Sequence, residues 1–137
     1  MNKIGKLSNV AKTLAEFFNQ VCPAFIQNNI PDSIYDPSTG QNEPVGYPRL
    51  TYTLETEDYY VDGNMQVRIY TKESGMKKVA ELTDKLNSLL GEGVSLQLKE
   101  GGYLYLRQGS PFNQFIIEDE KEQIKSAYIN ITYQNIF

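Results

Sequence analysis

Apolar side chains recur with two different periods in different segments of this chain. Apolar side chains first recur every three or four positions, which predicts an amphipathic helix over residues about 3–21. Pro23 disfavours helical geometry in the residue before it and so ends this helix. A second stripe predicts a helix between Ser74, which can cap its N-terminus, and Gly91, which suits its closing position. The apolar positions are Leu7, Val10, Leu14, Phe17, Phe18 and Val21 in the first helix and Val79, Leu82, Leu86, Leu89 and Leu90 in the second.

Elsewhere the period is two, which is typical of β-strands. The last strand alternates between an apolar and a polar face, so one side of its sheet meets water, as antiparallel sheets allow. Because the helices are separated by strands rather than alternating with them singly, we predict an α+β fold, a mostly antiparallel sheet with two helices packed on one face. The predicted strands are 49–55, 65–70, 94–99, 103–108, 112–118 and 126–134.

Between the first helix and the first strand lies a Pro-rich segment, residues 27–48, which contains four prolines. This composition predicts an irregular loop with a short extended piece at Ile34 and Tyr35. A chain of 137 residues is of the common size for one domain. We therefore expect a single domain, 1–137, with its sheet and helix core over 49–137.

Composition argues against catalysis. The chain has a net charge of −4, no histidine and one cysteine, Cys22. An internal disulfide is therefore excluded, and no imidazole exists to activate a thiol, so Cys22 is interpreted as a buried small residue. No signal peptide or membrane-spanning run is evident, which favours a cytoplasmic protein. We expect no enzyme activity, cofactor or metal.

The acidic stretch Glu118, Asp119, Glu120 and Glu122 lacks the alternating ligands and the glycine of a calcium loop, so it is interpreted as a solvated hairpin turn. Asp58 and Asp62 flank two tyrosines, but a tyrosine-rich hairpin tip is more typical of a contact surface than of acid–base chemistry. Arg49, Arg68 and Arg107 lie on predicted strands, two of them beside tyrosines, and could line a nucleic-acid platform. Because their spacing does not match an RNA-binding strand motif and the chain is acidic, they are instead expected to pair with carboxylates within the sheet or across a subunit contact.

The strands carry more aromatic and apolar surface than a lone domain usually exposes at its sheet edges. We therefore predict association through these side chains. The candidate contact residues are Tyr59, Tyr60, Asp62, Phe112, Phe115, Ile117, Glu118, Asp119, Glu120, Ile136 and Phe137.

The strand pair Tyr47-Pro-Arg-Leu-Thr-Tyr-Thr-Leu54 and Gln66-Val-Arg-Ile-Tyr-Thr71, and the closing Ser110-Pro-Phe112 and Tyr128-Ile-Asn-Ile-Thr-Tyr133, carry a resemblance. Over residues about 5–134 the chain resembles the tail terminator (tail completion, minor capsid) proteins of long-tailed bacteriophages. The resemblance implies a small α+β subunit that forms a hexameric ring, stops growth of the tail tube and meets the head connector.

The same resemblance implies partners and a location. The partners are further copies of the chain, the tail tube protein and the head connector or stopper, while genome DNA only passes through the ring. The protein is then expected in the tail or neck of the virion, and in the host cytoplasm during assembly. Net negative charge agrees with such a lumen, because an acidic wall repels phosphate.

Other functions stay open. A head–tail connector, a stopper or a tail-tube-like subunit fits the same pattern of elements. A small ligand-binding or regulatory domain that uses a tyrosine-lined face is an alternative from a different class.

Overall fold

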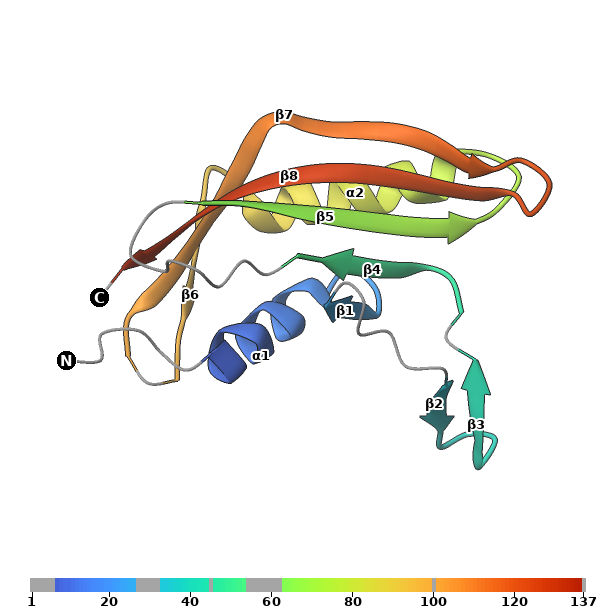
Figure 1. The fold of residues 1–137 in the computed structure, drawn as a ribbon, viewed down its shortest axis with the longest axis horizontal. Coiled ribbons are helices and arrows are strands. Elements are labelled where there is room, and N and C mark those ends of the chain that lie inside the picture. Colours follow the sequence, from blue (N-terminus) through green and yellow to red (C-terminus); the bar gives the residue numbers. More distant parts are fainter. Residues whose placement is uncertain (1–6, 27–32, 45, 54–62, 100, 137) are drawn as a thin grey trace.

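The computed structural model describes residues 7–26, 33–44, 46–53, 63–99 and 101–136, and it confirms the α+β prediction. Two helices accompany a six-stranded sheet and a separate two-stranded one (Figure 1). The elements are α1 (Leu7–Phe18), β1 (Ala24–Ile26), β2 (Ser33–Asp36), β3 (Gln41–Pro44), β4 (Arg49–Tyr52), β5 (Gly63–Lys72), α2 (Lys77–Leu90), β6 (Val94–Gln97), β7 (Tyr103–Asp119) and β8 (Ile124–Ile136).

The strand order of the main sheet is β1-β4-β5-β8-β7-β6. All neighbouring pairs are antiparallel except β1 and β4, which run parallel. The central pair, β5 and β8, is continuous from Gly63 opposite Tyr133 to Lys72 opposite Ile124. The apolar positions of both strands therefore lie on one face, where Met65, Val67 and Ile69 are buried.

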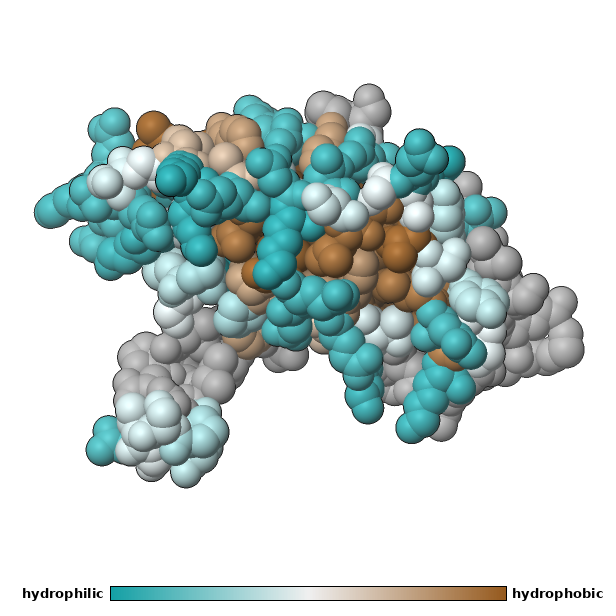
Figure 2. Space-filling view, turned by 180° about the vertical axis from the view of Figure 1, so that it is seen from behind, coloured by the Kyte–Doolittle hydropathy of each residue, from teal (hydrophilic) through white to brown (hydrophobic). Residues whose placement is uncertain are grey.

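Both helices cover that same face. The buried side chains of α1 and α2 belong to one core with those of β4, β5 and β8. The Phe18 ring lies 5.1 Å from the Tyr52 ring, and the Tyr52 hydroxyl donates to the Ala11 carbonyl at 3.2 Å, so α1 is held to β4. Seen from behind, the α2 side is mostly hydrophilic, with apolar atoms visible between polar side chains (Figure 2). Neither of the two described helices lies over the opposite face of β4, β5 and β8, which we call the helix-free face (Figure 1).

The prediction of two strands, over 103–108 and 112–118, is wrong in one respect, because these residues form a single bent strand, β7. Its register against β8 shifts between Gln108 and Asn113. Gly109 makes the close approach there possible, since an added Cβ would lie 2.9 Å from the backbone oxygen of Asn130. Pro111 has no N–H to donate, and it falls where the ladder is interrupted. The Ser-Pro-Phe sequence is therefore an irregularity within a strand and not a turn.

Two further predictions need correction. Part of the segment predicted as an irregular loop, 27–48, forms the β2–β3 hairpin, with Ser33 opposite Pro44 and Asp36 opposite Gln41. The short extended piece predicted at Ile34 and Tyr35 is confirmed, because both residues lie in β2. Ser74 does not cap α2, because the residue before the helix is Met76 and makes no side-chain capping bond. Gly91 closes the helix as predicted, with a φ of 54° that disfavours a residue with a Cβ.

Candidate association surface

The outer edge of β7 is covered over only part of its length. Strand β6 pairs with Tyr103–Leu106 alone, from Val94 opposite Leu106 to Gln97 opposite Tyr103. From residue 107 to 119, β7 pairs with β8 on its inner side, and no described strand lies on its outer side. A row of backbone donors and acceptors is therefore open to a neighbouring chain.

Apolar side chains accompany this open edge. Phe115 lies opposite Ala127, and Ile117 lies opposite Lys125. Ala127 and Lys125 are 0% and 6% exposed, whereas Phe115 and Ile117 are 44% and 53% exposed. The helix-side face of the sheet thus continues from the buried core onto a strand where the apolar side chains are about half exposed. Such a surface is typical of association.

Phe112 belongs more to the fold than to this surface, because it is partly buried and packs against the core. It is therefore a less useful contact candidate than Phe115 or Ile117. Ile136 ends β8, with its backbone opposite Tyr103. Tyr59, Tyr60, Asp62 and Phe137 lie outside the described residues.

The β7–β8 turn is a solvated turn, as predicted, and its acidic residues have different roles. The Asp119 carboxylate accepts from the backbone N–H groups of Lys121 and Glu122 at 3.0 and 3.1 Å, which shapes the turn. Glu118 accepts from the Ser126 hydroxyl at 2.6 Å, and Glu122 pairs with Lys72 at 3.3 Å. No carboxylate bond of Glu120 is found within the described residues, and this exposed side chain remains available to a partner.

The helix-free face carries a second feature, a row of arginine and tyrosine side chains from neighbouring strands. Its register places Arg49 beside Tyr70 and Arg68 beside Tyr128. The Arg49 guanidinium lies 4.6 Å from the Tyr47 ring centre and 5.8 Å from that of Tyr70, and the Arg68 guanidinium lies 4.1 Å from that of Tyr128. We call Tyr47, Arg49, Arg68, Tyr70 and Tyr128 the arginine–tyrosine strip.

Each arginine of the strip uses one guanidinium nitrogen on a tyrosine. Arg49 donates to the Tyr47 hydroxyl at 3.3 Å, and Arg68 donates to the Tyr70 hydroxyl at 3.4 Å. The Nε atoms of both arginines are buried without a hydrogen-bond partner. Because a guanidinium carries five N–H donors, most of its capacity stays unused in both cases.

The sequence predicts that these arginines pair with carboxylates, within the sheet or across a subunit contact. Among the described residues, no such ion pair within the sheet is found. Arg107 donates instead to the Thr132 hydroxyl at 3.1 Å. The hydrogen bond that Arg68 donates to Tyr70 is the main cause that raises the pKa of Arg68, and Glu118 adds an electrostatic attraction without an ion pair. Burial, followed by the hydrogen bond with Glu118, raises the pKa of Tyr128. Arg68 therefore keeps its positive charge and Tyr128 stays neutral at neutral pH.

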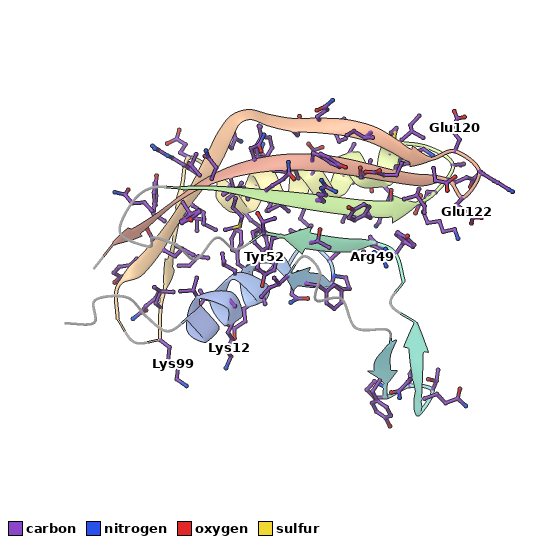
Figure 3. All side chains as sticks on the ribbon, viewed as in Figure 1. Lys12, Arg49, Tyr52, Lys99, Glu120 and Glu122 are labelled. Atoms are coloured by element: carbon purple, nitrogen blue, oxygen red, sulfur yellow. The ribbon has the colours of Figure 1, made fainter. Side chains whose placement is uncertain are left out.

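Small-molecule chemistry finds little support in the described part of the chain. Two neighbouring hollows of about 300 and 290 Å³ lie between α1 and the segment 95–99, and both basic and acidic side chains line the first, namely Lys12, Glu16 and Lys99. Lys12 and Lys99 extend from the body at this end of the molecule (Figure 3). No group of side chains suited to a metal ion occurs among the described residues.

Cys22 has the character expected of a core residue. It is buried at 7% exposure, and this burial raises the pKa of its thiol to about 12 despite the opposing effect of Lys85. A thiol that stays protonated is a poor nucleophile. Within the described residues, no helix is long and apolar enough to cross a membrane.

Comparison with known proteins supports the fold. No family model matches the sequence. No curated protein matches it either. Eleven chains of known structure match. One of them, from a protein whose name states no function, has a TM-score of 0.57 and 14% sequence identity, over 95% of this chain and 92% of its own. At this identity the likeness shows a shared fold alone.

Proposed function

We propose that this protein is a structural subunit of a long-tailed bacteriophage that assembles into a ring, ends the tail tube and joins it to the head connector. The open outer edge of β7, with Phe115 and Ile117 exposed beside it, is the observation that carries this proposal. A head-to-tail contact repeated around an axis closes into a ring and covers one such edge in every subunit.

Other features agree with a role in assembly. A buried thiol with a pKa of about 12, and the mixed charges around the described hollows, offer no evident chemistry for a reaction. The net charge of −4 suits a wall past which DNA moves, because negative side chains repel phosphate. The resemblance over residues about 5–134 supplies the specific role in the tail.

A tube-capping assay tests the proposal. Tail tubes that lack their terminator are mixed with the purified protein and imaged by negative-stain electron microscopy. We expect a ring on one end of each tube and no further growth after more tube protein is added. Tubes that keep growing would contradict the role in termination.

The same images separate the related functions. A tail-tube-like subunit would form tubes by itself, and a connector or stopper would bind head portals but leave tube growth unchanged. Closed dimers would indicate that two β7 edges pair with each other, which is an isologous contact and not a ring.

A further inference from the structure

We infer that the arginine–tyrosine strip is a binding site for the acidic β7–β8 turn of a second copy of this chain, with Glu120 as the carboxylate that enters it. The inference rests on the self-association part of the proposed function and assigns the two surfaces that meet. It is independent of the role in the tail.

The strip is built to receive a carboxylate. Its guanidinium groups are held over tyrosine rings, and each donates a single bond to a tyrosine hydroxyl, so their positions are set before a ligand binds. A stacked guanidinium still presents a planar edge of N–H donors that matches a carboxylate. Each guanidinium keeps further N–H donors for which no acceptor is found among the described residues.

The β7–β8 turn of the same chain carries the matching carboxylate. Glu120 is exposed and its carboxylate makes no bond within the described residues, whereas Asp119 and Glu122 are engaged by the turn and by Lys72. Glu120 and Glu122 lie at the end of the β7–β8 hairpin (Figure 3), whereas Arg49 lies on β4, and β5 and β8 stand between β4 and β7. We therefore assign the contact between Glu120 and the strip to two different copies, related head to tail.

Charge favours this occupant over nucleic acid. Arginines beside tyrosines on an open sheet face could also hold phosphates and stacked bases. The chain as a whole has a net charge of −4 and a pI near 4.8, so its field repels a polyanion. A single acidic turn meets mainly the local field of the strip, in which Arg49 and Arg68 are opposed by Glu118 beside Arg68 and Tyr128. The turn also continues the hairpin that carries Phe115 and Ile117, so one neighbour can cover both.

A charge-exchange experiment tests the inference by sedimentation velocity. Glu120→Lys alters the turn and Arg49→Glu alters the strip, and each variant alone should associate at least about tenfold more weakly than the parent protein. An equimolar mixture should recover association, because a lysine turn then meets a glutamate strip while the parental turn meets the parental strip. Glu81→Lys makes the same charge change on the exposed face of α2 and should have no effect.

Two further measurements keep the result decisive. Arg49→Gln removes the positive charge but preserves a polar side chain of similar size. Circular dichroism establishes that each variant is folded. In a sample of Arg49→Lys that mixes ¹⁴N and ¹⁵N chains, a carbodiimide should join Glu120 of one chain to position 49 of another. Absence of that mixed-isotope cross-link, or equal association of Glu120→Lys and the parent, would overturn the inference.

The failure modes are distinguishable. Charge exchange that restores association in a protein that never caps tubes supports the contact and refutes the role in the tail. Tube capping that is indifferent to Glu120→Lys and Arg49→Glu supports the role and refutes the contact. Binding of a single-stranded oligonucleotide that is lost in Arg49→Glu, with association unchanged, would assign the strip to nucleic acid.

Discussion

The two halves of β7 pair with the same neighbour, β8, yet they have opposite surroundings. Leu104 and Leu106 lie between β6 and β8 and are 1% and 0% exposed, whereas Phe115 and Ile117 are 44% and 53% exposed. The residue types are equally apolar, so the difference comes from the strand on the outer side. Apolar residues on a covered half stabilise the fold, and those on an uncovered half remain available to another chain.

The largest expected difference between the halves is in stability. Leu106→Ala removes a fully buried side chain and should lower the free energy of unfolding by about 2–5 kcal/mol. Phe115→Ala removes a larger but exposed side chain and should change it by only about 0.5 kcal/mol. Urea unfolding followed by circular dichroism measures both. Equal losses would show that the two halves are not different in this way.

Association should show the reverse order. Phe115→Ser with Ile117→Ser removes the exposed apolar surface and should weaken self-association by at least about tenfold, while the monomer stays folded. Sedimentation velocity measures the loss. Asn113→Ser with Gln114→Ser is the matched control, because it changes two exposed polar positions of the same strand. Normal assembly of the first variant would remove Phe115 and Ile117 from the interface.

Hydrogen exchange sharpens the comparison at the level of the backbone. In the monomer, amides of residues 103–106 should exchange slowly, since β6 and β8 pair with both sides of this segment. Between residues 113 and 119, the amides that face outward should exchange quickly and the alternate amides slowly. Uniform protection across residues 103–119, measured by NMR, would indicate that the outer edge is already covered within one chain.

Thiol chemistry gives the smallest and most local test. A cysteine introduced by Phe115→Cys should react rapidly with a thiol reagent near pH 8, while Cys22 should stay unreactive until the chain unfolds. The reason is burial, which raises the pKa of Cys22 to about 12. Mass spectrometry counts the labels.

The same shift has a consequence for stability. The folded state holds the Cys22 proton more tightly than the unfolded chain, in which the pKa is 9.0. The stability that the folded state gains by holding this proton is therefore present below pH 9.0 and is lost as the pH rises toward about 12. Between these values the parent protein should lose stability more steeply than Cys22→Ala. Parallel slopes would contradict the assignment of a buried thiol.

Elements with a long, regular period were predictable from the sequence, and those that depend on distant pairing were not. Strands β5 and β8 and helix α2 carry clear alternation or a helical stripe. The three residues of β1 have no such signal, because they become a strand only by pairing in parallel with β4. Gly109 and Pro111 are typical turn residues, but continued pairing with β8 on both sides of them keeps β7 one strand.

The two candidate surfaces also differ in how far the sequence predicts them. Exposure of Phe115 and Ile117 follows from sequence reasoning, because an apolar outer strand has no partner left in a small sheet. The arginine–tyrosine strip draws on β4, β5, β8 and the residues before β4, and only the register brings it together. Its signal in the sequence is the alternate spacing of Tyr47 with Arg49 and of Arg68 with Tyr70, on one face of each strand.

Hydrogen exchange of the assembled protein tests the central claim, association through the outer edge of β7, most directly. The exchange rates of residues 113–119 are compared between the dilute monomer and the protein bound at tube ends, with residues 103–106 as the internal reference. We predict strong new protection of the outward-facing amides in residues 113–119 and little change in residues 103–106. Assembled protein in which residues 113–119 exchange as fast as in the monomer would contradict the account.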